Sequence, residues 1–292
     1  MSDFRARNWV FLGDSITEGV GSSRFSYVSE LASMINDRAG KNDAAVFRLR
    51  WQSPDVLGRQ VMFNCLANCS VSTGDAPGLW IWNLASEGQV IDTDFAWLPL
   101  LANLRPEKIF IMRGALESIM RPECYVSQQH PFWIPREWRG YAALDPRCYF
   151  SDTWWRRAKQ RLVDGIKQKL RHHLLRTRPV RSLMAPDVFQ AKLDQFCAAA
   201  SQCTSQLVLL GLVPVSDETF PGSRGRFEMI DQIISQVARK YHASFVDMKQ
   251  AMSRQTMQDS SEKLFYLDGF HPTLTGARQM AQNILNGIGG LS

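Results

Sequence analysis

Short apolar segments alternate with amphipathic segments along most of this chain. The apolar segments have the length of β-strands, and the amphipathic ones repeat their apolar residues at intervals of three and four, as helices do. Strands that alternate with helices form a mostly parallel sheet covered on both faces. We therefore expect an α/β fold with a five-stranded parallel sheet. The expected strands are 8–12, 79–85, 108–112, 206–213 and 244–248, and the expected helices are 27–38, 95–104, 189–201, 227–241 and 274–285.

A serine follows the first of these strands. The segment Gly13-Asp14-Ser15-Ile16-Thr17 comes directly after the apolar run Trp9-Val10-Phe11-Leu12. In open α/β sheets, reactive groups collect at the carboxyl ends of the strands, where backbone N–H groups of the next helix can receive negative charge. Ser15 is therefore placed where a nucleophile is expected.

An acid and a histidine occur together near the other end of the chain, in Asp268-Gly269-Phe270-His271-Pro272. A serine, a histidine and an acid are the parts of a nucleophilic acyl-transfer site. The alternative is that Asp268 caps the following helix and that His271 is a surface loop residue. We favour the catalytic interpretation, with Ser15 as nucleophile, His271 as base and Asp268 orienting the imidazole.

These two motifs resemble those of SGNH (GDSL-type) serine hydrolases, which carry Gly-Asp-Ser near the N-terminus and Asp-x-x-His near the C-terminus. The resemblance covers residues 8–117 and 187–287. It implies a three-layer, flavodoxin-like sandwich and ester hydrolysis or acyl transfer through an acyl-enzyme on Ser15. It implies no cofactor, and we expect no metal.

The same family has two further motifs that supply donors to the oxyanion. A strand followed by Asn-x-x-x-x-Gly matches Asn83 to Gly88, so the resemblance makes the N–H groups of Ser15 and Gly88 oxyanion donors. The fourth motif, Gly-x-Asn-Asp, matches Gly114-Ala115-Leu116-Glu117 only in part. Leu116 stands where the family has an asparagine whose amide is the third donor.

Several explanations of Leu116 remain open. Arg113, Asn83 or a backbone N–H near Gly114 could replace the missing donor. The protein could be a slow or specialised hydrolase, or an acyltransferase whose lid excludes water. It could also be a catalytically weak or inactive relative that binds a ligand or partner, although the serine, histidine and acid are all present.

Four residues near these motifs are candidates for substrate binding: Asp14, Asn83, Arg113 and Glu117. Two of them also have a structural interpretation, which we favour for Asp14 and rate about equal for Glu117. Asp14 could orient the nucleophile turn through backbone hydrogen bonds. Glu117 could be a helix-start residue that the helix dipole favours.

Two stretches do not fit the simple alternation, and we interpret them as insertions in a single domain spanning 1–292. The first covers 41–78 and the second 118–185. The first half of the second insertion is rich in aromatic residues and proline, a composition that suits a lid or a substrate wall.

The second insertion ends in a basic segment, 152–176, with the periodicity of a helix. It contributes much of the formal net charge of +6. We expect it to pack through its apolar stripe and to expose its charges for solubility, without nucleic acid; contact with an anionic partner is the alternative. The expected apolar stripe is Trp155, Ala158, Leu162, Ile166 and Leu170, and the charged face holds Arg156, Arg157, Lys159, Arg161, Lys167, Lys169 and Arg171.

Location and substrate follow less directly from the sequence. We expect no signal peptide, because the first residues lead directly into the first strand. No apolar run approaches 18 residues, and the six cysteines are expected to stay reduced. We therefore expect a cytoplasmic protein without a membrane span. The expected substrate is a small-molecule ester, a carbohydrate O-acetyl group or a carrier-bound acyl chain.

Overall fold

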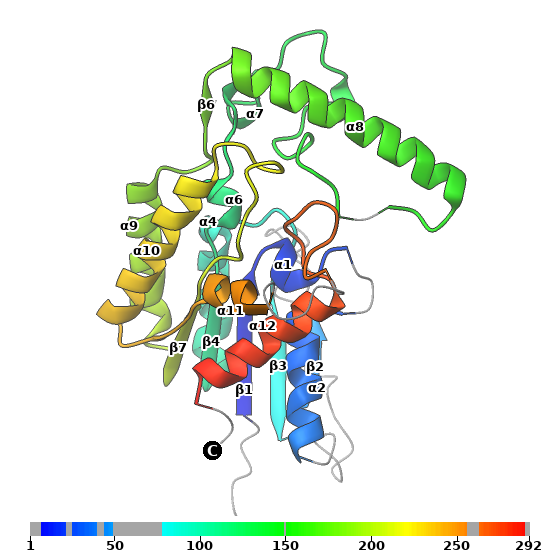
Figure 1. The fold of residues 1–292 in the computed structure, drawn as a ribbon. Coiled ribbons are helices and arrows are strands. Elements are labelled where there is room, and N and C mark those ends of the chain that lie inside the picture. Colours follow the sequence, from blue (N-terminus) through cyan, green and yellow to red (C-terminus); the bar gives the residue numbers. More distant parts are fainter. Residues whose placement is uncertain are drawn as a thin grey trace, which may run out of the picture.

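The computed structural model describes residues 7–21, 25–39, 44–48, 78–148, 150–255 and 263–289. Its centre is a six-stranded sheet in the order β2-β3-β1-β4-β7-β8, in which every neighbouring pair is parallel (Figure 1). The fold is α/β with a mostly parallel sheet, as the alternation predicted. The strands are β1 (Arg7–Gly13), β2 (Ala44–Arg48), β3 (Leu79–Asn83), β4 (Lys108–Met112), β7 (Gln206–Leu210) and β8 (Ser244–Val246).

The expected count of five strands was wrong, because β2 adds a sixth at one edge. This strand lies inside the stretch 41–78 that we interpreted as an insertion, and it pairs with β3 so that Ala44 lies opposite Leu79. It has five residues and two of them are alanine, so its apolar signal is weak. The rest of that insertion, 49–77, lies outside the described residues.

Helices cover both faces of the sheet (Figure 1). α2 (Tyr27–Ala39) and α12 (Leu274–Gly287) pack together on one face, and α11 (Met248–Gln255) contacts α12. The other face carries α9 (Pro186–Ala200) and α10 (Arg224–Lys240), which pack together, with α4 (Ile91–Asp94), η1 (Phe95–Trp97) and α5 (Leu98–Leu104) beside α9. The apolar residues Ile230, Ile233, Ile234 and Val237 of α10 are buried.

The order of strands in the sheet reverses at β1, with β3 on one side of it and β4 on the other. Without the edge strand β2, the sheet has the flavodoxin-like order in which the second strand lies on one side of the first and all later strands lie on the other. Ligands bind at this point in such sheets, beyond the carboxyl ends of the strands. Ser15 begins α1 (Ser15–Glu18) there, immediately after β1.

The second insertion forms structure of its own. A two-stranded antiparallel sheet, β5 (Arg121–Pro122) with β6 (Val180–Arg181), joins its two ends. Between them lie α7 (Glu123–Val126), η2 (Arg136–Trp138) and α8 (Trp154–Thr177), which extends across the end of the molecule (Figure 1). A small separate core forms from Tyr125, Ile134, Leu144 and Leu174.

The expectation that α8 packs through its apolar stripe was wrong for most of the stripe, since only Leu170 among its large residues packs against the small core. The buried residues of this helix are Lys167, Arg171 and Leu174, whereas Leu162 and Ile166 are exposed. Arg171 faces inward because its guanidinium donates a hydrogen bond to the carbonyl oxygen of Thr219. Among the described helices, none is long and apolar enough to span a bilayer.

Candidate active site

The nucleophile turn is built by close backbone packing at the end of β1. A Cβ atom at Gly13 would lie 2.0 Å from Thr17 Oγ1, so only glycine fits there without a shift of the turn. Asp14 is the N-cap of α1, and its Oδ1 accepts a hydrogen bond from the N–H of Ile16 at 3.0 Å. Ser15 therefore occupies a fixed position in the first helical turn, with its side chain almost completely buried.

The histidine loop is a tight turn held by its own acid. Asp268 Oδ1 accepts hydrogen bonds from the N–H groups of Phe270 and His271, both at 3.1 Å. A bridge between Phe265 and Pro272 closes the base of the turn. The alternative role for Asp268 as the helix cap is not seen, because Thr273 caps α12 instead.

The loop brings an imidazole to the serine. His271 Nδ1 lies 2.6 Å from Asp268 Oδ2, and His271 Nε2 lies 2.9 Å from Ser15 Oγ. The three side chains that the motifs nominated are thus joined in one hydrogen-bonded chain, although 256 residues separate the serine from the histidine. Burial acts to lower the pKa of His271, but the hydrogen bonds to Asp268 and Cys148 outweigh it and raise that pKa above its ordinary value.

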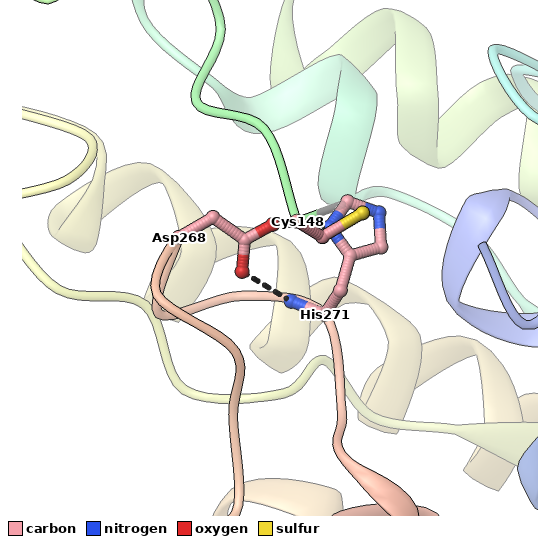
Figure 2. Close-up of side chains that lie close together, drawn as sticks. All are labelled: Cys148, Asp268 and His271. Atoms are coloured by element: carbon pink, nitrogen blue, oxygen red, sulfur yellow. Dashed lines mark hydrogen bonds and ion pairs between the residues drawn. The ribbon is translucent and has the colours of Figure 1, made fainter. Parts of the chain in front are cut away.

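Cys148 is a neighbour of this triad that sequence reasoning missed. Figure 2 shows the side chains of Cys148 and Asp268 close to the imidazole of His271, with Asp268 to its left. Ligand atoms of the three residues lie within 4.8 Å of one another, the only such group found among the described residues. Asp268 Oδ2 is already bonded to the histidine ring, so a metal ion here would have to displace that bond.

The loop that follows β3 is tied to the nucleophile helix. Asn83 donates from its side-chain amide to the carbonyl oxygen of Thr17 at 2.9 Å. Glu87 N–H donates to Glu18 Oε2 at 2.6 Å. Gly88 comes next, with φ at +78°, a value that favours glycine. The proposed oxyanion loop is therefore held beside α1 by two hydrogen bonds from residues that precede Gly88.

Leu116 lies in α6 (Ala115–Ser118), directly after β4, and belongs to the main hydrophobic core. Its neighbour Glu117 is buried and serves the backbone, since Oε1 accepts from Ile91 N–H at 2.8 Å and Oε2 from Gly114 N–H at 3.2 Å. Burial raises the pKa of Glu117 to about 7, against the opposing effect of Arg113. The helix-start interpretation of Glu117 fits these contacts better than a substrate contact.

A buried ion pair between Arg113 and Asp94 lies next to the loop that contains Gly88. Arg113 binds Asp94 through the Nε–Nη2 edge of its guanidinium, Nε to Oδ2 at 2.8 Å and Nη2 to Oδ1 at 2.5 Å. Its Nη1 donates to the carbonyl oxygen of Gln89 at 3.0 Å. Both charged side chains are almost completely buried, so the pair orders the loop between β3 and α4.

Arg113, Asn83 and the N–H of Gly114 itself, which are among the candidate replacements for the missing oxyanion donor, are engaged elsewhere. The Arg113 guanidinium is bound to Asp94 and Gln89. The Asn83 amide is bound to Thr17, and the N–H of Gly114 is bound to Glu117. Asp14, Asn83, Arg113 and Glu117, which we expected to bind substrate, are buried and bonded to protein groups. Their contact with a substrate stays a prediction.

Chemically, this arrangement can activate a hydroxyl. An imidazole that is hydrogen-bonded to a carboxylate at one nitrogen and to a serine hydroxyl at the other can accept the hydroxyl proton. The N–H of Ser15 lies in the first turn of α1 and has no partner within that helix. It is therefore available to an anionic oxygen beside the nucleophile.

Solved structures share this fold. The α/β hydrolase LAE5 from the metagenome of Lake Arreo is similar to this protein over 99% of this chain and 99% of the LAE5 chain, at 17% identity and a TM-score of 0.55. Axe2, an acetylxylan esterase from Geobacillus stearothermophilus, is similar to it over 98% of this chain and 95% of the Axe2 chain, at 14% identity and a TM-score of 0.53. A GDSL-like lipase from Parabacteroides merdae is similar over 97% of this chain and 96% of the lipase chain, at 12% identity and a TM-score of 0.53.

The likeness establishes the fold that the motif resemblance implied. The identities are low, so it speaks for the arrangement of strands and helices. No family model matches the sequence, and no curated protein matches it.

Proposed function

We propose that this protein hydrolyses an ester or transfers its acyl group through an acyl-enzyme on Ser15. The observation that carries the proposal is the continuous chain from Ser15 Oγ to His271 Nε2 and from His271 Nδ1 to Asp268 Oδ2. A serine hydroxyl is a weak nucleophile at neutral pH and requires a positioned base. The chain supplies that base and holds its tautomer.

The reaction proceeds in two halves. His271 accepts the proton as Ser15 Oγ attacks the acyl carbonyl carbon, and Asp268 stabilises the imidazolium. Collapse of the tetrahedral intermediate breaks the ester C–O bond, and His271 returns its proton to the leaving alkoxide. Water or another alcohol then attacks the acyl-enzyme, with His271 again acting as base. In this proposal the N–H groups of Ser15 and Gly88 bind the oxyanion in both halves.

The proposed substrate is a small-molecule ester, a carbohydrate O-acetyl group or a carrier-bound acyl chain in the cytoplasm. The likeness to a structure described as an acetylxylan esterase supports the carbohydrate O-acetyl ester among these. The second insertion, 118–185, would act as the lid, because Tyr141 donates a hydrogen bond to the carbonyl oxygen of Gly88. A lid that excludes water favours acyl transfer to an alcohol over hydrolysis.

A second candidate is a catalytically weak relative that binds a ligand or partner. The observation that favours it is the engagement of Arg113, Asn83 and Gly114 N–H by other protein groups, since none of them is free to replace the donor lost at Leu116. Loss of one oxyanion donor costs about 10²- to 10³-fold in rate. Slow turnover with an intact nucleophile would fit this candidate.

Labelling with a fluorophosphonate probe tests the proposal, because the probe reacts with an activated serine. We expect label on the wild type, none on Ser15→Ala and at least a hundredfold slower labelling of His271→Gln, about the contribution of a general base. Ser205→Ala, a surface serine whose Oγ bonds to Glu107, is the matched control and should label normally. Label that persists on Ser15→Ala, or a folded wild type that takes none, would contradict an activated Ser15.

A panel of esters then separates the two candidates and the two reactions. Acetyl to long-chain esters are assayed with and without an added alcohol. Transfer predicts ester formation with the alcohol in preference to free acid. A protein that labels at Ser15 but turns over none of the esters would favour the binding module.

A further inference from the structure

Helix α8 exposes an apolar stripe of large side chains. Trp155 is 51% exposed, Leu162 67% and Ile166 47%. These residues are seven and four positions apart, so they lie on one face of the helix. Trp154, at the start of the helix, is 78% exposed. Large apolar side chains gathered on one surface mark a site of interaction.

The inner face of α8 explains why this stripe remains outside. Arg171 donates to the carbonyl oxygens of Thr219 and Met120 and lies 5.1 Å from the ring centre of Phe220. Lys167 lies 5.5 Å from the ring centre of Trp138. Arg171 and Lys167 thus face the body of the protein. Trp155, Leu162 and Ile166 lie on another side of the helix, and none of the described residues covers them.

The stripe is bordered by positive charge. α8 contains eight Lys and Arg residues and one acid, Asp164. Lys159 lies between Trp155 and Leu162 on the helix surface, and Lys169 lies one turn beyond Ile166; both lysines are exposed. An apolar strip with tryptophan at one end and lysines along its borders has the composition of a helix that lies in the plane of a membrane surface.

We propose that α8 docks this protein on the surface of an anionic lipid bilayer. Trp154 and Trp155 would lie at the headgroup level, where tryptophan is enriched. Leu162 and Ile166 would enter the acyl boundary, and the lysines would contact anionic headgroups. The charge of the helix complements that surface.

Two other binding partners, a second copy of this chain and a nucleic acid, fit these residues less well. A second copy of the same face would bring the lysines of two helices together, with Asp164 as the only acid in each to offset them. A nucleic acid would use the positive charges but would leave Leu162 and Ile166 without partners, because phosphate contacts are electrostatic. The anionic bilayer uses both the charges and the apolar stripe.

Docking through α8 would place the serine near the membrane. The inward contacts of Arg171 are to residues that follow β7 and β4, at the same end of the sheet as Ser15. In Figure 1, α8 spans this end of the molecule, beyond α1 and the histidine loop. The docking itself does not depend on the proposed reaction, since binding is measured without substrate.

Vesicle co-sedimentation of the full chain tests the docking. We expect binding to vesicles of phosphatidylcholine and phosphatidylglycerol at 3:1, weakened by salt, and no binding to phosphatidylcholine alone. Leu162→Gln/Ile166→Gln should weaken binding about tenfold or more, because two apolar side chains no longer enter the bilayer. Lys159→Gln/Lys169→Gln should weaken it roughly 25-fold, about fivefold for each charge.

Two double variants provide matched controls. Val188→Gln/Met229→Gln removes two other exposed apolar side chains, which are 42% and 47% exposed. Arg105→Gln/Arg239→Gln removes two other exposed charges. Both should bind vesicles as the wild type does, and all variants should keep the wild-type circular dichroism spectrum.

Three results would overturn the proposal. The first is a wild type that stays in the supernatant or binds neutral vesicles equally well. The second is a Leu162→Gln/Ile166→Gln variant that binds vesicles normally but changes a dimer to a monomer in sedimentation velocity, which would make the face an interface between copies. The third is vesicle binding that the α8 variants leave unchanged while tight binding to a DNA duplex is lost with Lys159→Gln/Lys169→Gln.

Discussion

Tyr141 donates a hydrogen bond from its hydroxyl to the carbonyl oxygen of Gly88 at 3.0 Å. The two residues come from different parts of the chain, the second insertion and the loop after β3. A Cβ atom at position 88 would lie 2.6 Å from the Tyr141 oxygen, so the contact requires glycine. The second insertion therefore holds the loop at Gly88 in place. We propose that this loop supplies a donor to the oxyanion.

Tyr141→Phe should lower kcat on an activated ester about three- to tenfold with a smaller change in KM. The loop at Gly88 loses its bond to the insertion, and a loosely held oxyanion donor stabilises the transition state less. The cost in unfolding free energy should be about 1 kcal/mol, as for one neutral hydrogen bond. Steady-state kinetics and urea unfolding measure the two effects.

The matched control for this change is Tyr241→Phe. The Tyr241 hydroxyl donates to the carbonyl oxygen of Asp194 at 3.1 Å, between α10 and α9. It should cost a similar unfolding free energy and leave kcat unchanged. Equal kinetic losses in the two variants would mean that the Tyr141 bond serves stability alone.

Cys148→Ala should move the acidic limb of the pH profile of kcat/KM to lower pH. The base must be neutral, so activity rises as the pH passes the pKa of His271. Burial acts to lower this pKa, while Asp268 and Cys148 raise it. Without Cys148 one raising influence is lost, the pKa falls and a larger fraction of the histidine is neutral at pH 7.

The control for this profile is Cys203→Ala, a cysteine whose thiol contacts the carbonyl oxygen of Ala199 in the turn after α9. Its limb should coincide with that of the wild type. A Cys148→Ala limb at the wild-type position or at higher pH would show that the thiol does not support the protonated imidazole.

Leu116→Asn should raise turnover on a small activated ester. The side-chain amide would supply the donor that Arg113, Asn83 and Gly114 N–H cannot, since each of these is bonded elsewhere. Because Leu116 packs in the core, burial of the amide should cost about 1 to 3 kcal/mol of unfolding free energy. Turnover is therefore compared at a temperature where both proteins are folded, and an unchanged or lower rate would mean that the oxyanion is bound in another way.

The sequence predicted the parts of this protein that depend on local pattern. The strand before Ser15 was predicted from its apolar run and the segment at His271 from its motif, and the structure has β1 and a turn at these places. β2 was missed because two of its five residues are alanine, which makes its apolar signal weak. Cys148 carries no motif, and only the folding of the insertion brings it to His271.

The orientation of α8 was beyond local pattern for a different reason. Periodicity identified the apolar stripe, but the face that packs is decided by distant partners. Asp145 lies 2.6 Å from Arg121 Nη2 and 3.8 Å from Arg171 Nε, so one carboxylate holds two buried guanidinium groups. A buried arginine finds acceptors only in the folded state, and no spacing within the helix reveals them.

Asp94→Ala should lower the unfolding free energy by about 3 to 5 kcal/mol, because it leaves the buried charge of Arg113 without its bidentate partner. Asp92→Ala, on the same helix, is the control: its carboxylate is 49% exposed and pairs with Lys192, and such a pair contributes about 1 kcal/mol or less. Urea unfolding followed by circular dichroism compares the two. The paired Asp94→Ala/Arg113→Met variant should recover part of the loss, since removing both charges removes the unpaired one. Equal stabilities for Asp94→Ala and Asp92→Ala would show that the guanidinium finds sufficient compensation from Asp14 and Glu117, whose charges also act on it.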